Sequence, residues 1–329
     1  MNKSYDVIGF GNTLMDFLIE VDDGMLTSLN LNKGEFHLID QEKANGILTH
    51  LITRQLPIQT VPGGSSANTL RGIAFLGGKA ILYGKVGQDT HGISYVKQVE
   101  DHGVISRITT RDDMITGHAI TFITPDAQRT FSVHLGAAVH LTKEDVLEDD
   151  VKNSKILHLE GYQLEGPTLS TMVHTLELAK KHHTLISMDL ADPGVIRRNK
   201  NFLQTMVQKY VDILFVNEQE AKEFTDMGVS DAAQELGKWV KTAVIKVGAQ
   251  GSLIQHQQKI MKVDAFSAQA LDTTGAGDTY AAGFLYGHSQ GWKIEDAGKL
   301  GSLFASKIVE QIGVKMKHLD AEELKRMIQ

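Results

Sequence analysis

The chain has 329 residues, 42% hydrophobic and 22% charged, a composition typical of a globular protein with a large buried core rather than of a disordered chain. Its 33 Lys and Arg residues against 40 Asp and Glu residues give a net charge of -7, which argues against a nucleic acid backbone as the main partner. The absence of cysteine excludes disulfides, thiolate metal sites and a cysteine nucleophile.

The N-terminal stretch MNKSYDVIGFGNTLMDFLIEV lacks both an uninterrupted apolar segment and a small-residue cleavage signal. No apolar run in the chain approaches the roughly 20 residues that a membrane-spanning helix needs. We therefore expect a soluble, cytoplasmic protein that does not associate with a membrane.

The first predicted strand, YDVIGFG, leads directly into GNTLMD, which contains Asn12 and Asp16. Ligands of open α/β sheets bind beyond the carboxyl ends of strands, so Asp16 is a candidate ligand-binding residue. The alternative is an ordinary surface aspartate. Further on, the glycine-rich segment Pro62–Asn68 (PGGSSAN) opens a helical pattern with small residues, and the strand AILYGKVG follows.

A second set of strands (FLIEV, GHAITFIT and RTFSVHL) alternates polar and apolar residues, as half-exposed antiparallel strands do. The segment Pro125–Gln128 predicts the turn between the last two of these strands. We expect these strands to form a small β-lid beside the main sheet, built from segments about 14–22, 34–39 and 105–135.

After residue 150, buried strands alternate with helices. The strands are KILHLEG, TLISMDL, DILFVN and TAVIKVG, and the predicted helices lie near 167–182, 199–210 and 217–239. This alternation indicates a doubly wound α/β fold with a mostly parallel central sheet covered on both faces. We expect one such domain over residues 1–329.

Two polar motifs follow predicted strands of this region. Asn217 is the last residue of DILFVN, and Glu220 lies about one helical turn later. A structural capping box explains this spacing as well as a binding site does. The segment Lys246–Gly251 (KVGAQG) closes TAVIKVG. It is either a nucleotide-binding turn or an ordinary hairpin turn.

The segment Leu271–Asp278 (LDTTGAGD) precedes a helical run over residues 279–289. A glycine-rich turn that opens a helix presents unpaired N–H groups and the positive end of the helix dipole, which together bind a phosphoryl oxyanion. A carboxylate in the first turn, here Asp278, can then take a proton from an attacking hydroxyl. The alternative is that Asp278 only caps the helix.

Taken together, these segments resemble the ribokinase-like (PfkB) carbohydrate kinase family and, within it, the adenosine-kinase-like branch. The stretch from GGSSAN through Gly77-Gly78 to GKVGQD is similar to the first signature of the family, and DTTGAGD with its helix is similar to the second. The resemblance runs in order from GNTLMD to the helices after residue 294.

This resemblance implies an ATP-dependent phosphotransferase with an alcohol group as acceptor. Asp278 is then the catalytic base, and the N–H groups of Gly275, Ala276 and Gly277 form the anion hole. The other site residues follow by motif: the substrate binds Asn12, Asp16, Gly63, Gly64, Asn68 and Arg129; ATP binds Asn217, Lys246, Gly248 and Gly251; Mg²⁺ is held, through water, by Glu220; and a monovalent cation such as K⁺ binds Asp272 and Thr274. Many members have Thr at the position of Lys246, where a lysine would instead make a charge contact.

We expect the acceptor to be the primary hydroxyl of a nucleoside such as adenosine, with apolar lid residues Leu14, Phe17, Leu38 and Phe122 enclosing the purine. A free-sugar kinase, acting on ribose, fructose or a keto-deoxy sugar acid, is the alternative. A homodimer through the lid strands is compatible with the resemblance.

Other classes are less well supported by the motifs. A non-catalytic nucleotide or sugar sensor would need no base, yet Asp278 and the Gly-Ala-Gly turn are both present. A structural interaction protein gains no support from these glycine-rich turns. The chain contains no P-loop, and Gly9-Phe10-Gly11 lacks the third glycine of a dinucleotide-binding fingerprint.

Overall fold

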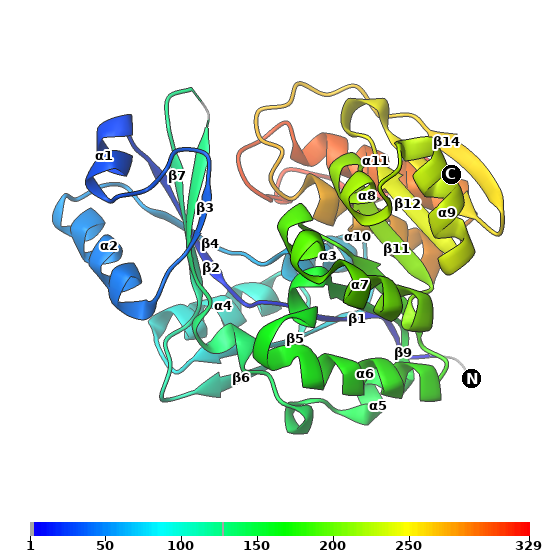
Figure 1. Cartoon of the computed structure of the whole chain (residues 1–329), viewed down its shortest axis with the longest axis horizontal. Coiled ribbons are helices and arrows are strands. Elements are labelled where there is room, and N and C mark those ends of the chain that lie inside the picture. Colours follow the sequence, from blue (N-terminus) through cyan, green and yellow to red (C-terminus); the bar gives the residue numbers. More distant parts are fainter. Residues whose placement is uncertain (1–2, 127) are drawn as a thin grey trace.

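Two β-sheets of different size organise the chain, whose computed structural model describes residues 3–126 and 128–329 (Figure 1). The large sheet has nine strands in the order β14-β13-β12-β11-β10-β9-β1-β5-β6. Their bounds are β1 Tyr5–Phe10, β5 Ala80–Gly87, β6 Ile105–Arg111, β9 Ser154–Glu160, β10 Leu185–Asp189, β11 Ile213–Asn217, β12 Thr242–Lys246, β13 Ser252–His256 and β14 Lys259–Val263.

The seven strands from β12 to β6 are parallel, and the hairpin β13–β14 adds an antiparallel edge. Burial on both faces explains why these strands consist of almost continuous apolar runs. Alternate residues of each strand enter different core clusters: Val7 of β1 packs on one face and Ile8 on the other. The predicted doubly wound, mostly parallel sheet is thus confirmed.

Helices cover both faces of the large sheet. Buried residues of α3 (Ser65–Phe75), α4 (Thr90–Asp101), α10 (Ala276–Ser289), α11 (Ile294–Ile308) and α12 (Ala321–Arg326) belong to the first core cluster. Those of α5 (Glu148–Asn153), α6 (Leu169–Lys181), α7 (Pro193–Tyr210), α8 (Glu218–Thr225) and α9 (Val229–Trp239) belong to the second. Among the helices of the described residues, none has the length and apolar character needed to cross a membrane.

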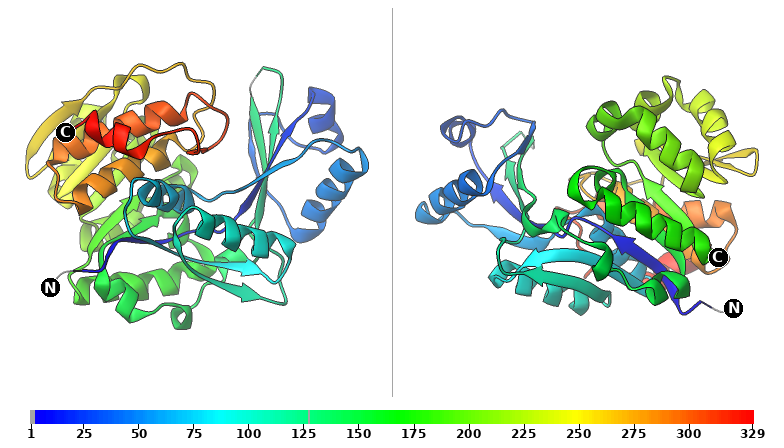
Figure 2. Two further views of the ribbon diagram at one scale, coloured as in Figure 1. Left: turned by 180° about the vertical axis from the view of Figure 1, so that it is seen from behind. Right: turned by 60° about the horizontal axis from the view of Figure 1, so that its bottom comes forward.

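The small sheet has five strands in the order β3-β8-β7-β2-β4, with bounds β2 Met15–Glu20, β3 Phe36–Leu38, β4 Gln59–Pro62, β7 His118–Ile123 and β8 Arg129–His134. It stands at one end of the molecule, with α1 (Asp23–Ser28) and α2 (Gln41–Thr53) on its outer face and the main body on the other side (Figures 1 and 2). Strands β7 and β8 are antiparallel, and the Thr124 amide donates to the carbonyl oxygen of Gln128 at 3.0 Å. Ala127, in the predicted turn, lies outside the described residues.

Strand alternation decides which lid residues face the main body. Asp16 pairs in register with Ala119, which pairs with Val133, so these three residues share the inner face. Phe17 and Phe122 lie on the opposite face, 3% and 0% exposed, within the core cluster that includes residues of α2. The prediction that these two phenylalanines enclose a purine is therefore wrong.

Two further predictions need correction. Residues 105–111, expected in the lid, form β6 and pair with β5 at the edge of the large sheet, whereas the short strand β4 was missed. The helix expected over 217–239 is two helices, because Asp226 adopts a left-handed conformation (φ = 61°) that ends α8. The helix expected near 199–210 is the second part of α7, which begins at Pro193 after the Asp192 cap and is kinked at Asn199 (φ = -130°).

Candidate active site

Polar residues end four neighbouring parallel strands. Glu160 ends β9, Asp189 ends β10, Asn217 ends β11 and Lys246 ends β12. Asn12 follows β1, which is the next strand in the sheet. Because the carboxyl ends of parallel strands lie along one edge of a sheet, the fold gathers these side chains where open α/β sheets bind ligands.

The N-terminus of α10 presents free amide groups. Gly275 caps the helix at φ = 74°, a left-handed conformation that favours glycine, and a Cβ there would lie 2.1 Å from Cγ2 of Val314. The Ala276 amide donates to the carbonyl oxygen of Thr273 at 3.2 Å. Within the described part of the chain, the amides of Gly275 and Gly277 have no hydrogen-bond acceptor. Two of the three predicted anion-hole amides are therefore free, and the helix dipole adds to their attraction for an anion.

Asp278, in the first turn of α10, is held by the start of α3. Its Oδ1 accepts a hydrogen bond from Ser65 Oγ at 2.5 Å, and its Oδ2 accepts one from Asn68 Nδ2 at 2.9 Å. Burial raises the pKa of Asp278, and the charge of Asp189 raises it further, against the lowering effect of these two hydrogen bonds. A carboxylate with a raised pKa is a stronger base, fixed here in one orientation.

The glycine pair before α3 lets Asp16 and Asn12 approach closely. A Cβ on Gly63 would lie 2.1 Å from Oδ1 of Asp16, so any side chain at position 63 would displace the carboxylate. Gly64 has φ = 90°, and a Cβ there would lie 2.3 Å from the carbonyl oxygen of Asn12. Tyr95 also holds this turn, because its hydroxyl donates a hydrogen bond to the Gly63 carbonyl at 2.8 Å. Lack of space for a Cβ explains Gly63, and lack of space together with a positive φ explains Gly64.

The carboxyl of Asp16 is electrostatically linked to Asp278. Burial raises the pKa of Asp16 to about 7, the Arg71 charge opposes this rise and the Asp278 charge adds to it. Arg71 is itself buried and donates to the Pro62 carbonyl at 3.0 Å and to Asn68 Oδ1 at 3.3 Å. Asp16 lies against Gly63 and Asp278 accepts a hydrogen bond from Ser65, so the two carboxyl groups contact the same glycine-rich turn.

Lys246 lies beside the N-terminus of α10. Its Nζ is 2.6 Å from Oδ2 of Asp189 and 3.1 Å from the place that a Cβ of Gly277 would occupy. Burial lowers the pKa of Lys246, but the charges of Asp189 and Glu220 outweigh burial and raise it overall. The ammonium group is therefore a permanent positive charge next to the free amide of Gly277.

Glu220 forms a capping box with Asn217. The Glu220 carboxylate accepts hydrogen bonds from the Asn217 amide at 2.8 Å and from Asn217 Nδ2 at 2.6 Å, and Asn217 Oδ1 accepts from the Glu220 amide. Burial raises the pKa of Glu220 to about 7, and the charge of Asp189 adds to the rise. The capping box that the sequence allowed is therefore present, and its hydrogen bonds fix the orientation of the Glu220 carboxylate.

Glu160 is a buried carboxyl that sequence reasoning missed. It is 2% exposed, and its Oε1 has no hydrogen-bond partner within the described part of the chain. Burial raises its pKa to about 8, the nearby charge of Asp278 adds to the rise, and the hydroxyls of Ser66 and Ser65 reduce it. Burial and the charge of Asp278 therefore favour the protonated form of the Glu160 carboxyl.

The turn with Gly248 and Gly251 joins β12 to β13. Gly251 adopts φ = 91°, and a Cβ there would lie 2.0 Å from the carbonyl oxygen of Val263. The Val247 amide donates to the Gly251 carbonyl at 2.8 Å, which closes the turn of an antiparallel hairpin. Both glycines thus serve the hairpin, directly after Lys246.

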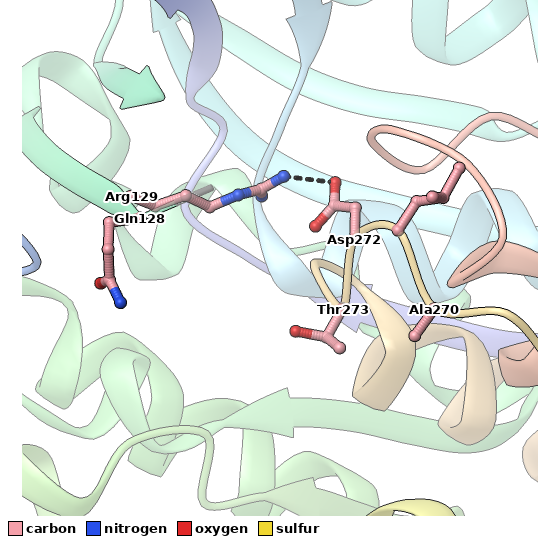
Figure 3. A pocket seen from close by; sticks show the side chains of 6 residues that line it. Gln128, Arg129, Ala270, Asp272 and Thr273 are labelled. Carbon is pink, nitrogen blue, oxygen red and sulfur yellow. Dashed lines mark ion pairs between the residues drawn. The ribbon is translucent and has the colours of Figure 1, made fainter. Parts of the chain in front are cut away.

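Arg129, at the start of β8, reaches from the small sheet to the loop before α10. Its guanidinium lies 2.6 Å from Oδ2 of Asp272 and donates a second hydrogen bond to Oγ1 of Thr274. Figure 3 shows the two charged side chains pointing toward one another at a cavity of about 300 Å³, which Gln128 and Thr273 also line. The lid and the loop of the anion hole are therefore in direct ionic contact.

Among the residues that sequence reasoning missed, Asp189, Glu160 and Arg71 carry the strongest electrostatic effects on this site. A usable signal existed for the first two, because each ends an apolar strand with a carboxylate. Arg71 had a weaker one, a charge within the small and apolar pattern of α3.

The chain is similar to known proteins in sequence and in fold. A family model described as pfkB family carbohydrate kinase matches residues 38–320. The crystal structure of adenosine kinase from Sinorhizobium meliloti superposes with a TM-score of 0.88 and 31% identity, covering 99% of both chains. Adenosine kinase of Saccharomyces cerevisiae is 26% identical over 93% of this chain and 95% of its own. A 5-dehydro-2-deoxygluconokinase of Clostridium perfringens is 30% identical over 75% of this chain and 78% of its own.

The buried proton of Glu160 should make stability depend on pH. Its pKa is about 4.5 without the fold and about 8 within it, so the folded state keeps a proton that the unfolded state loses between these values. The wild type should therefore lose up to about 1.4 kcal/mol of unfolding free energy per pH unit through this group as the pH rises across that window. Glu160→Gln, which stays neutral, should become progressively more stable than the wild type over the same window.

Urea unfolding at about pH 5 and about pH 8.5, which span most of this window, measures the difference in unfolding free energy between Glu160→Gln and the wild type at each pH. The exposed Glu42→Gln is the matched control and should differ from the wild type equally at both pH values. An equal difference for Glu160→Gln at both pH values would show that the buried carboxyl is not protonated.

Proposed function

The chain belongs to the pfkB family of carbohydrate kinases, and from that premise we propose that it transfers the γ-phosphoryl group of ATP to a primary hydroxyl of a nucleoside such as adenosine. As a member of this family it is a phosphotransferase that acts on an alcohol group of a sugar or nucleoside. The observation that carries the finer proposal is that Asp16 and Asp278 contact the same turn, at Gly63 and Ser65, while Asp278 lies in the first turn of α10 beside its free amides.

In the proposed reaction, Asp278 takes the proton of the acceptor hydroxyl as its oxygen attacks the γ-phosphorus. The bond between that phosphorus and the β-γ bridging oxygen breaks, so the products are a phosphomonoester and ADP. Ser65 and Asn68 hold both carboxylate oxygens of Asp278, which keeps the base oriented before substrate binds. Such positioning provides much of the rate enhancement in phosphoryl transfer.

Charge develops on the transferring phosphoryl oxygens next to fixed positive groups. The amides of Gly275 and Gly277 donate hydrogen bonds to them, and Lys246 supplies a full charge on the same side. Asp189 holds the ammonium group in place without substrate. Asn217 and the turn of Gly248 and Gly251 lie at the ends of β11 and β12, where they would flank the remainder of ATP.

The residues present fit a magnesium ion that enters with ATP and is held through water. In the described ranges no three His, Asp or Glu side chains form a direct metal cage. The charge of Asp189 nevertheless raises the pKa of both Glu220 and Asp278, and among the ion pairs of the described residues only Asp189 of these three carboxylates has a cation partner. Mg²⁺ would neutralise negative charge on the β- and γ-phosphates, and Glu220 would bind its water ligands.

The inner face of the small sheet supports a nucleoside acceptor. Asp16 and Asn12 offer oxygen acceptors for the hydroxyls of a sugar ring. Beyond them the inner face continues with apolar residues, namely Leu18, Ala119, Phe131, Val133 and, at the edge, Leu38, which is 64% exposed. Val133 and Ala119 are buried, Leu18 and Phe131 are partly buried and Leu38 is exposed, and such a partly accessible apolar wall next to a polar sugar site suits a base attached to a ribose.

A free-sugar kinase is the second candidate. It is favoured by the 30% identity to the 5-dehydro-2-deoxygluconokinase of Clostridium perfringens. A non-catalytic sensor is less well supported, because a pure binding site needs neither the oriented carboxylate of Asp278 nor its raised pKa. The edge strands β3 and β4 are where the homodimer suggested by the resemblance would form.

An acceptor screen tests the proposed reaction. ADP release should be stimulated by adenosine more than by ribose, fructose or a keto-deoxy sugar acid, and Asp278→Asn should lower kcat about 10²- to 10⁴-fold because the base is lost. Asp231→Asn is the matched control, since Asp231 also lies in the first turn of a helix but is exposed. No stimulation by any acceptor would favour the sensor, and stimulation only by a free sugar would favour the second candidate.

The charge of Lys246 can be tested separately from the fold. Lys246→Thr with Asp189→Asn removes the ion pair without leaving a buried carboxylate unpaired. The double variant should keep the wild-type melting temperature within a few degrees and the acceptor KM, whereas kcat should fall about 10- to 10³-fold. Unchanged kcat would mean that the ammonium group plays no part in phosphoryl transfer.

A further inference from the structure

Two groups of residues that the sequence suggests for different purposes are in contact. The resemblance assigns Arg129 to the substrate and assigns Asp272 and Thr274 to a monovalent cation. In the structure, the guanidinium of Arg129 contacts both of the side chains that would hold this cation (Figure 3). One positive charge already lies where a second one would have to bind.

The carboxylate of Asp272 has little capacity left for a cation. Its side chain is 2% exposed. Its Oδ1 accepts from the Thr274 amide at 2.8 Å, and its Oδ2 accepts from the Gly313 amide at 2.7 Å as well as from Arg129 at 2.6 Å. Burial alone would raise the pKa of Asp272, but these hydrogen bonds lower it overall. A carboxylate offers about four lone pairs, and three of them face N–H groups, so the residues present do not fit a bound K⁺.

The ion pair connects the lid with the loop that shapes the anion hole. The amides of Leu271 and Asp272 donate to the Val309 carbonyl at 2.7 and 3.1 Å, which ties this loop to the segment after α11. Gly275, the cap of α10, comes directly after Thr274. Arg129 reaches this loop from β8 of the small sheet, so its guanidinium can fix the loop only when the lid stands as it does here.

We propose that Arg129 is a built-in replacement for the monovalent cation: its guanidinium neutralises Asp272, binds Thr274 and positions the loop that presents the amides of Gly275 and Gly277. Arg129 is then a positioning residue of the kinase reaction. It makes catalysis independent of K⁺. The planar fork of arginine suits this task, because it contacts a carboxylate and a hydroxyl at once and cannot lose its charge. This inference rests on the proposed function for its rate measurements.

The test compares salts. In chloride salts of potassium and of tetramethylammonium at equal ionic strength, wild-type kcat should agree to within about twofold, since K⁺ has no free site. Arg129→Ala should lose about 10- to 100-fold in tetramethylammonium, the effect of a lost charge-assisted hydrogen bond. Potassium or guanidinium ions should restore much of that loss, because the cavity of about 300 Å³ at the ion pair lets a small cation reach Asp272.

Arg111→Ala is the matched control, because Arg111 is also paired with an aspartate, Asp113, but lies at the end of β6. It should show the same kcat in all three salts. Arg129→Lys keeps the charge without the fork and should lie between the wild type and Arg129→Ala in tetramethylammonium. Activation of the wild type by potassium well beyond twofold, or Arg129→Ala that is equally impaired in every salt, would overturn the inference.

Thermal unfolding in the same salts needs no acceptor and separates the two proposals. The melting temperature of the wild type should be the same in potassium and tetramethylammonium, whereas that of Arg129→Ala should be higher in potassium. If the wild type turns over no acceptor, the proposed function fails, yet this salt difference still decides whether Arg129 replaces the cation. A potassium-specific stabilisation of the wild type would contradict the inference on its own.

Discussion

The hydrogen bonds from Ser65 and Asn68 to the carboxylate of Asp278 join the starts of two helices that are more than two hundred residues apart in sequence. Every other feature of the site depends on this junction. It brings the free amides of α10 to the carboxyl edge of the sheet, and it requires a glycine turn before each helix. Because Gly63 has no side chain, the carboxylate of Asp16 lies against it, and the same turn holds Asp278 through Ser65.

This arrangement concentrates negative charge. The pKa values of Asp16, Glu160 and Glu220 are raised to about 7, 8 and 7, each first by burial and then by neighbouring carboxylates. The balancing positive charges come from Arg71, Arg129 and Lys246. Each of them already contacts a partner in the protein without a ligand. Buried groups of this kind reduce stability, and they persist where they serve binding or catalysis. The site is therefore preorganised for a ligand that brings both phosphates and a metal cation.

The periodicity of the strands and the glycine-rich turns sufficed to predict the large sheet and its covering helices, because these follow from local pattern. The grouping of Asn12, Asp16 and Asn68 with Asp278 was expected only from the resemblance to the kinase family. Long-range facts did not follow. Three such facts depend on strand pairing and on side-chain reach across the molecule. Strand β6 joins the large sheet, Phe17 lies on the face of the small sheet opposite to Asp16, and Arg129 pairs with Asp272. Neither strand pairing nor side-chain reach has a signature in a single stretch of sequence.

The most direct measurement is a crystal structure of the enzyme with ADP, aluminium fluoride, magnesium and adenosine, in which the fluoride complex stands in for the transferring phosphoryl group. The account predicts the 5′-oxygen of adenosine within hydrogen-bond distance of Asp278, the ribose hydroxyls on Asp16 and the fluoride ligands on the amides of Gly275 and Gly277 beside Lys246. A complex in which the fluoride group binds away from the start of α10, or in which Asp278 contacts no acceptor oxygen, would contradict it.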